Sequence, residues 1–126
     1  AKLSDVSPDG SARPVTMGWL LASHREIDEA RSTPTEVVHD HTRPRALVPG
    51  EPEVLDFSLH PFANLFAAGH RVRLELSSDP VKMAPPPDSR FVYFPHLGPP
   101  YPARNDILCG RGSGNGDGSA LELHVR

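Results

Sequence analysis

Serine, aspartate and histidine are the residue types in this sequence that could support hydrolysis, with seven histidines among its 126 residues. In an α/β-hydrolase the nucleophilic serine follows the pattern G-x-S-x-G, because it lies on a sharp turn between a strand and a helix. Ser113 does not fit this pattern, since Arg111 and Asn115 hold the glycine positions. Ser11 does not fit it either, since Asp9 precedes it by two residues. No local pattern supplies an oriented histidine base, so we predict no catalytic residue in this chain.

A metal site is the second chemistry that the residue types allow. His39 and His41 flank Asp40, and alternate residues of a strand point to the same side, so the two imidazoles could share a metal ion. This resembles the H-x-H motif of the cupins. A cupin also needs a carboxylate three or four residues later, and residues 42–46 supply none. A solvated edge strand is the more ordinary interpretation, and we predict no metal and no cofactor, with His39 and His41 as the candidates if a metal does bind.

Trp19 and Cys109 each allow a functional and a structural interpretation. Trp19 could be an exposed platform on which a sugar stacks, but beside Leu20 and Leu21 a buried or interface position is the commoner outcome. Cys109 has no adjacent histidine or basic cluster to lower its pKa, so we interpret it as a small inert hydrophobe. The glycines of residues 110–118 match no phosphate-binding pattern.

Composition favours an all-β fold and restricts the partners. Fifteen prolines and ten glycines, with few runs of helix formers, are typical of short strands with frequent turns. The net charge of −3 is not concentrated in a basic stripe or an acidic tail, so we expect neither a nucleic acid nor a membrane partner. The single cysteine excludes an internal disulfide and mildly favours a reducing compartment, so a cytoplasmic location is the expectation, with secretion left open.

Hydrophobic alternation predicts the strands that would position these residues. We expect strands at residues 1–6 and 15–24, joined by a turn at residues 7–10, with Trp19 and Leu21 on one covered face. Residues 25–49 are predicted to be an excursion loop, with room for one helical turn at 26–31 and a short edge strand at 35–41.

A second pair of strands is expected at residues 55–59 and 71–76. The connection between them, residues 61–69, is too apolar for a solvated loop, so we expect it to fold over one end of the core before Gly69 turns the chain. His70 is expected to hydrogen-bond this loop and fix the start of the next strand. Arg71 and Arg73 alternate with Val72, so they form either a solvated face or a surface that pairs with carboxylates of a neighbouring domain.

The last third of the chain has a different composition. Prolines at residues 85–87 predict an extended linker-like crossing, and residues 91–94 form an apolar run of strand type. The segments 107–109 and 121–125 flank the glycine run, which predicts a hairpin connection.

Two long motifs occur here in a recognisable order. The sequence AKLSDVSPDG…GWLLASHR is followed by PGE…LDFSLHPFANLFAAGHRVRLELSSDP. Together they resemble the C-terminal domain of the X-Pro dipeptidyl-peptidase and cocaine esterase family of serine hydrolases. The resemblance covers residues 1–80 well, whereas the segment after Asp79 departs from the family pattern.

The resemblance implies a fold and a role. The fold would be an antiparallel β-sandwich of jelly-roll, galactose-binding-like type, a single domain over residues 1–126 that lacks its first strands. The catalytic triad would lie in an α/β-hydrolase domain of the same polypeptide, and this domain would pack on it to wall the active site or to support a homo-oligomer. The residues expected at that interdomain contact are Trp19, Leu21, Phe62, Phe66, Arg71 and Arg73.

Two other functions stay open at this point. A free-standing carbohydrate-binding jelly roll would use an exposed aromatic row, for which Trp19, Tyr93 and Tyr101 are available. A cupin-like metal-binding domain would use His39 and His41. Fold resemblance by itself does not identify a substrate.

Overall fold

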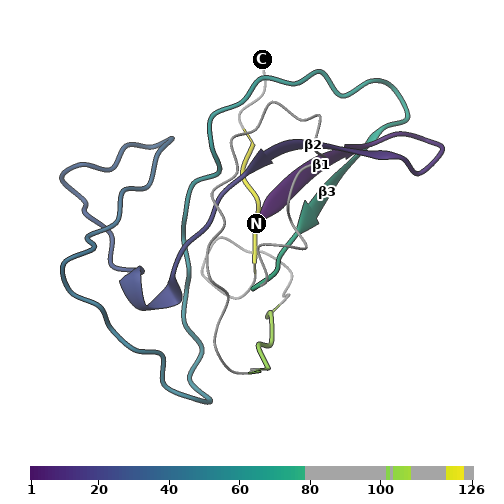
Figure 1. Ribbon diagram of the computed structural model, residues 1–126. Coiled ribbons are helices and arrows are strands. Elements are labelled where there is room, and N and C mark those ends of the chain that lie inside the picture. Colours follow the sequence, from purple (N-terminus) through teal and green to yellow (C-terminus); the bar gives the residue numbers. More distant parts are fainter. Residues whose placement is uncertain (79–101, 103, 109–118, 124–126) are drawn as a thin grey trace.

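A computed structural model of the chain describes residues 1–78, 102, 104–108 and 119–123. Its regular elements are β1 (Lys2–Val6), β2 (Ala12–Met17), the 3₁₀ turn η1 (Ala22–His24) and β3 (Arg71–Glu75) (Figure 1). The three strands form one antiparallel sheet in the order β2-β1-β3. The all-β prediction is confirmed for this part of the chain. The second sheet of the expected jelly-roll sandwich is not among the described elements.

The β1–β2 hairpin forms where the sequence predicts its turn. Ser7 donates its backbone N–H to the carbonyl of Ser11, and Gly10 donates to the carbonyl of Ser7, both at 2.9 Å. Gly10 has a φ of 89°, which a glycine adopts without steric cost. The Asp9 carboxylate also accepts bonds from the backbone and the hydroxyl of Ser11. Local hydrogen bonds among residues 7–11 therefore close this loop.

The core lies around the central strand. Four of the five residues of β1 are buried, because β2 and β3 cover its two edges and other segments cover its faces. The buried apolar side chains among the described residues are Leu3, Val6, Val15 and Met17. The register between β1 and β2 shifts at Leu3 and Ser4, which marks a bulge in the ladder.

The prediction of a strand at residues 55–59 is wrong. The segment is not assigned to a strand, and its backbone contact with the sheet is the bond from His60 N to Met17 O, at 2.9 Å. The Thr16 hydroxyl donates to His60 O beside it. Alternating side chains gave this segment two faces, but a strand also needs a partner backbone along its length, which the segment does not find.

The predicted strand at residues 15–24 is also only partly correct. β2 ends at Met17, and the chain then turns through η1 instead of continuing. The side chains that the prediction placed on a covered face are exposed, Trp19 by 44% and Leu21 by 67%. Gly18 packs against the backbone of Ser58 and Leu59 so closely that a Cβ there would collide with the Ser58 carbonyl oxygen.

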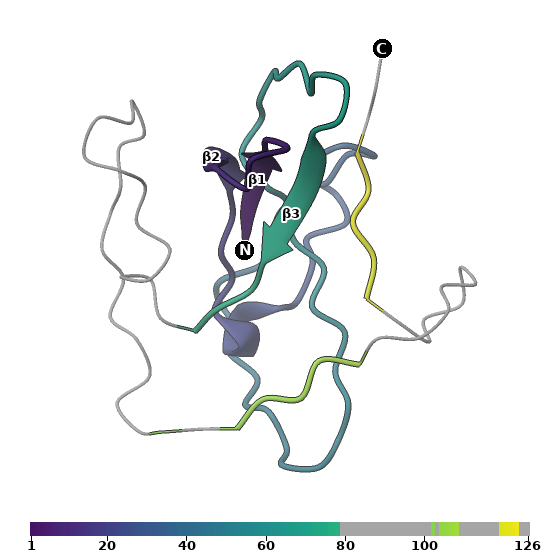
Figure 2. The ribbon, with the colours of Figure 1, turned by 90° about the vertical axis from the view of Figure 1, so that its right-hand side faces the viewer.

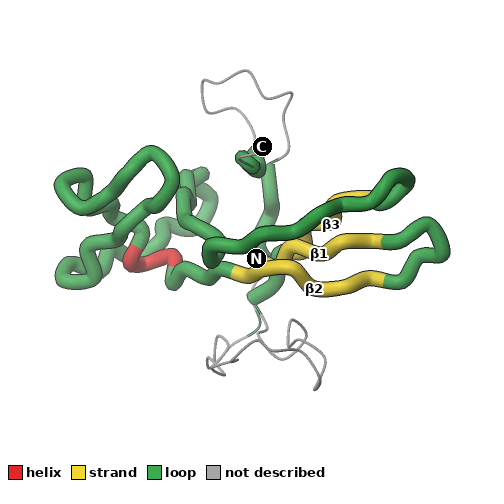
Figure 3. Tube along the Cα trace, turned by 90° about the horizontal axis from the view of Figure 1, so that it is seen from above, coloured by secondary structure: helices red, strands yellow, loops and turns green. Residues whose placement is uncertain are grey.

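The excursion loop at residues 25–49 is confirmed, and it lies beside the sheet beyond the Met17 end of β2 (Figures 1 and 3). No helix and no edge strand is assigned within it, but the backbone N–H groups of Arg31 and Ser32 bond the carbonyl of Asp28, at 3.2 and 2.9 Å, and close one turn in the predicted region. Isolated bridges join Ile27 to His39 and Thr33 to Glu36 in their place. The Thr33-Pro34 sequence and the short spacing between the two sides favour a tight turn over a ladder.

The connection at residues 61–69 covers the core only in part. Leu65 is 88% exposed, whereas Asn64 and Phe66 are partly buried. Gly69 turns the chain with a φ of 79°, as predicted. No helix in the described part of the chain is long and apolar enough to span a membrane.

The predictions for residues 85–87, 91–94 and Cys109, and for the glycine run, lie outside the described residues. The described parts of the predicted hairpin, residues 107–108 and 121–123, are not assigned to strands. They are linked near the glycine run by hydrogen bonds from the backbone and hydroxyl of Ser119 to the carbonyl of Leu108, both 3.1 Å.

Candidate functional site

Asp5 is the centre of a polar network beneath the connection at residues 61–69. It lies on the central strand with its side chain 5% exposed. Its carboxylate contacts His70 Nδ1 at 2.7 Å, Arg13 Nη2 at 3.3 Å and Asn64 Nδ2 at 3.4 Å. The Arg13 guanidinium also donates to Asn64 Oδ1 at 2.6 Å. The hydrogen bond to His70 holds the pKa of the Asp5 carboxyl below its ordinary value, with burial acting in the opposite direction and Asn64 adding to the lowering.

This network is structural in its chemistry. A paired aspartate and histidine are two parts of a hydrolytic triad, but within the described residues no serine hydroxyl is hydrogen-bonded to His70. His70 was expected to bond the preceding loop. Its side chain instead bonds Asp5 on β1, and the loop joins the same carboxylate through Asn64. The pairing therefore fixes the loop and the start of β3 onto the central strand.

Arg25 forms a second buried anchor, which the sequence analysis missed. Its side chain is 4% exposed, and its guanidinium makes a two-point contact with the Glu53 carboxylate, at 3.1 and 2.7 Å. The remaining Nη1 donates to the carbonyls of Ala22 and Arg45. The bonds from Arg25 lower the pKa of the Glu53 carboxyl against the effect of burial. Arg25 ends the GWLLASHR motif and Glu53 follows PGE, so their motif positions were the available signal.

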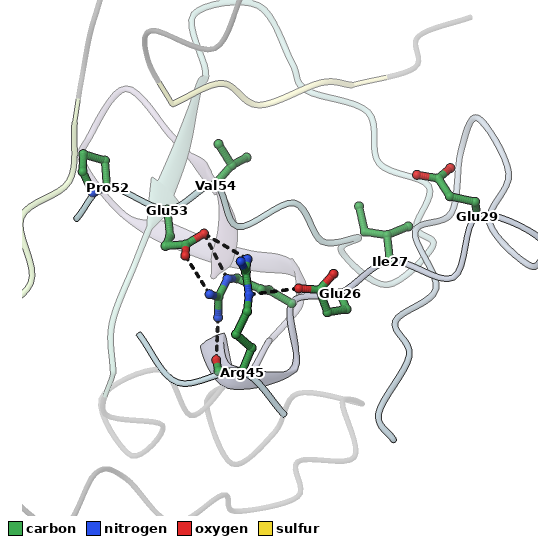
Figure 4. Close-up of a pocket in the computed structure, with 8 residues that line it drawn as sticks. Glu26, Ile27, Glu29, Arg45, Pro52, Glu53 and Val54 are labelled. Carbon is green, nitrogen blue, oxygen red and sulfur yellow. Dashed lines mark hydrogen bonds and ion pairs between the residues drawn. The ribbon is translucent and has the colours of Figure 1, made fainter. Parts of the chain in front are cut away.

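A polar cleft of about 450 Å³ opens over this anchor (Figure 4). Arg45 bridges its two sides, with ion pairs to Glu53 at 3.3 Å and to Glu26 at 3.0 Å. The cleft is lined by Arg25, Glu26, Ile27, Glu29, Arg45, Pro52, Glu53 and Val54. The guanidinium groups of Arg25 and Arg45 both bond the Glu53 carboxylate, and Arg25 also bonds the Arg45 carbonyl. We therefore interpret the charged groups of the cleft as holding the excursion loop in place and not as a ligand site.

The candidate metal residues lie in the excursion loop. The His39 ring is 6.2 Å from the His41 ring, and the His41 ring is 5.7 Å from that of His24. Hydrogen bonds from the side chain and backbone of Thr42 lower the pKa of Asp40 to about 2, so that carboxylate is already engaged. In the described part of the chain, no group of three or more His, Cys, Asp or Glu side chains is arranged to hold a metal ion.

The six residues expected at an interdomain contact do not form one patch. Trp19 and Leu21 follow the Met17 end of β2, where the Trp19 ring meets the His60 ring edge-on, at 5.0 Å and 74°. Arg71 lies at the opposite end of the sheet, because it pairs with Val6 next to the hairpin turn.

Phe62, Phe66 and Arg73 are the other three residues. Phe62 follows His60 by two residues and is exposed, whereas Phe66 is partly buried. Arg73 pairs with Ser4 in the middle of the sheet and is exposed. The exposed aromatic edge is defined as Trp19 and His60, whose rings meet, together with Leu21 and Phe62, which follow them by two residues. The Trp19–His60 contact lies at the Met17 end of β2, whereas Arg71 lies at the opposite end of the sheet.

Part of this chain is similar to known proteins. Two proteins named as serine esterases, from Mycobacterium bovis and Mycobacterium tuberculosis, are each 37% identical to this chain over 79 residues. The matched segment is 60% of this chain but 13% of each relative, so the chain spans a small part of the curated proteins that it matches. No solved structure matches the chain.

The family comparison covers most of the sequence. Residues 1–112 match the family described as the X-Pro dipeptidyl-peptidase C-terminal non-catalytic domain. Both motifs on which the resemblance was based lie inside that range, and the Asp5–His70 contact joins one to the other. The chain therefore belongs to the family of X-Pro dipeptidyl-peptidase C-terminal non-catalytic domains.

Proposed function

We propose that this domain packs on a catalytic α/β-hydrolase domain of the same polypeptide and helps to wall its active site. The family is non-catalytic by description, and the two mycobacterial relatives are named as serine esterases. The parent enzyme would be a serine hydrolase that cleaves acyl esters or X-Pro peptides. The chemistry of this domain is then indirect, through the shape of the entrance that it helps to form.

The observation that carries the proposal is the exposed aromatic edge. Trp19, the only tryptophan of the chain, is 44% exposed, and Leu21 is 67% exposed. The edge is rigidly held, because Gly18 packs on the backbone of Ser58 and His60 N bonds Met17 O. A large apolar side chain on a fixed backbone is the usual anchor of a protein interface, since little conformational entropy is lost on binding.

Docking of the isolated chain to a separately produced catalytic domain tests the proposal. We expect Trp19→Ala to weaken the association measured by isothermal titration calorimetry by about tenfold or more, as anchor residues do. Leu65→Ala is the matched control, because Leu65 is 88% exposed and lies on the adjacent connection, outside the aromatic edge. Equal affinities for the Trp19→Ala variant and the unchanged chain would refute the docking role of this edge.

Carbohydrate binding is the second candidate function, and the exposure of Trp19 favours it as well. A sugar binds by stacking on the face of an aromatic ring. The rings of Trp19 and His60 are not stacked face to face, since their planes meet at 74°. Saturable quenching of Trp19 fluorescence by neutral oligosaccharides would support this function. A spectrum that does not change with sugar would leave interdomain docking as the role of the edge.

A further inference from the structure

The two outer edges of the sheet are protected to different degrees. On β2, Pro14 has no backbone N–H to offer to another strand. The carbonyl of Met17 at the end of β2 already accepts a bond from His60 N–H, so this edge is partly occupied. β3 contains no proline, and its outer edge pairs with no strand of the described residues (Figure 2). A flat strand edge with unpaired N–H and C=O groups is a template for another strand.

The side chains of β3 and its continuation alternate in character. Val72, Leu74 and Leu76 are 46%, 38% and 50% exposed, and they share one face because they are two residues apart. Arg73 and Glu75 point to the opposite face, where Glu75 Oε2 lies 3.0 Å from Lys2 Nζ of β1 and 3.6 Å from Arg73 Nε. The strand therefore carries an apolar strip on one face and charges of both signs on the other.

Antiparallel pairing of this strand with its own copy is possible in a few registers. Along a strand, every second residue points its N–H and C=O groups toward the free edge. In an antiparallel pair such residues must lie opposite one another, so the two-fold axis between two copies passes through a residue that lies opposite itself. An axis at Arg73 places two copies of Arg73 opposite each other, and an axis at Glu75 does the same for the glutamates. An axis at Val72 places Arg71 opposite Arg73 twice. Like charges directly opposite one another destabilise a strand pair.

The register centred on Leu74 avoids every like-charge pair. It places Arg73 opposite Glu75 twice, Val72 opposite Leu76 twice, and Leu74 opposite its own copy. The apolar strips of the two copies then become continuous on one face, and the charged pairs match on the other. We propose that β3 pairs antiparallel with β3 of a second copy of this chain, about a two-fold axis at Leu74, joining the two sheets into one.

This interface does not depend on the proposed docking to a catalytic domain. The Trp19–His60 contact lies at the end of β2, and β2 and β3 are the two outer strands of the sheet, with β1 between them. The interface also gives the charges of β3 a positive role. Charged residues on an edge strand commonly prevent pairing. Here the order of the charges places like charges opposite each other when the axis is at Val72, Arg73 or Glu75, and opposite charges when it is at Leu74.

Sedimentation velocity of the 126-residue chain, from about 1 µM to about 500 µM, is the first experiment. We expect a concentration-dependent dimer that Arg73→Glu weakens by about tenfold or more, since two Arg–Glu pairs become Glu–Glu pairs. The control is Arg71→Glu, which makes the same charge change on the same exposed strand but faces Ser77 in this register. It should leave the dimer within about twofold of the unchanged chain.

Mixing two variants gives a test that a misfolded variant cannot imitate. A chain with Arg73→Glu and a chain with Glu75→Arg should each dimerise alone at least about tenfold more weakly than the unchanged chain, yet pair with each other, because both cross-strand pairs are then of opposite charge. Hydrogen exchange of the unchanged chain is the independent readout, with β3 amides more protected at high than at low concentration. A monomer at every concentration, or a dimer that Arg73→Glu does not weaken or that Arg71→Glu weakens equally, would overturn the proposal.

Discussion

Asp5 on the central strand and His70 at the start of β3 lie 2.7 Å apart, although 65 positions separate them in the chain. The contact joins the two motifs by which the family is recognised, and Arg13 and Asn64 bond the same carboxylate. The polar network thus fastens the hairpin, the connection at residues 61–69 and the third strand together. It explains why a domain without catalytic chemistry contains a buried aspartate and a histidine as partners.

We predict that Asp5→Ala lowers the thermal unfolding midpoint by several degrees. The substitution leaves the partly buried His70 and Asn64 donors without their acceptor, and a donor that is shielded from water and has no partner is costly. The Arg13 side chain is 65% exposed and keeps its bond to Asn64, so it adds little to this cost. Differential scanning fluorimetry measures the shift. Asp56→Ala is the control, because Asp56 is exposed and its loss should change the midpoint little. Equal midpoints for the two variants would contradict the structural role of the network.

We predict that stability is lost on acidification below about pH 4. The pKa values of the Asp5, Asp40 and Glu53 carboxyls are all lowered in the folded chain, that of Asp40 to about 2. A carboxyl with a lowered folded pKa stabilises the fold above its unfolded pKa, and this contribution disappears as the pH falls through the folded value. Urea unfolding midpoints between about pH 7 and about pH 2 should therefore be flat first and then fall.

The Asp40 carboxyl gives this pH prediction its internal control. Asp40→Asn removes one of the three titrating groups, so its unfolding midpoint should fall less steeply between about pH 4 and about pH 2. A slope identical to that of the unchanged chain would show that the hydrogen bonds from Thr42 do not stabilise the ionised form.

Gly18→Ala should destabilise the chain by about 1–3 kcal/mol, as overpacking does. The added methyl group meets backbone, with the Ser58 carbonyl oxygen in collision and Leu59 Cα at 3.0 Å, so no side-chain rotation relieves it. Gly10→Ala is the comparison, because it strains a positive φ but meets nothing within 4 Å. Urea unfolding measures both, and Trp19 fluorescence should shift in the Gly18 variant alone. A Gly18 variant as stable as the unchanged chain would show that the segment is free to move away.

Arg25→Lys should open the excursion loop. A lysine cannot reproduce the two-point contact with Glu53 together with the bonds to the Ala22 and Arg45 carbonyls, because it lacks the planar fork of donors. Trypsin should then cleave after Arg31 several-fold faster. Arg43→Lys is the matched variant, since the Arg43 side chain is 84% exposed. Equal cleavage rates in the two variants would mean that Arg25 does not hold the loop.

The sequence predicted the elements that depend on local chemistry. The turn at residues 7–10, the strand after Gly69 and the strand at the start of the chain all form, since Pro, Gly and short alternation act over a few residues. The strand at residues 55–59 was wrong because alternation specifies faces and not a partner backbone. Trp19 was expected to be covered, and its exposure depends on where β2 ends.

The partners in the polar contacts could not be predicted from hydrophobic periodicity. His70 was expected to be structural, but its bond to Asp5 joins residues whose separation leaves no periodic signal. Arg25 and Glu53 were not identified, since a charged pair is usually solvated and nothing local marks this one as buried. Arg71 and Arg73 were grouped with Trp19, and only the strand register shows that they lie at different parts of the sheet.

The most direct test of the central claim is hydrolase activity of the 126-residue chain beside that of the whole polypeptide that contains it. Para-nitrophenyl butyrate reports esterase activity, and glycyl-prolyl-para-nitroanilide reports X-Pro dipeptidyl-peptidase activity. A non-catalytic domain predicts hydrolysis by the whole polypeptide and no rate above buffer for the isolated chain. Turnover by the isolated chain that a serine-directed phosphonate abolishes would contradict the account.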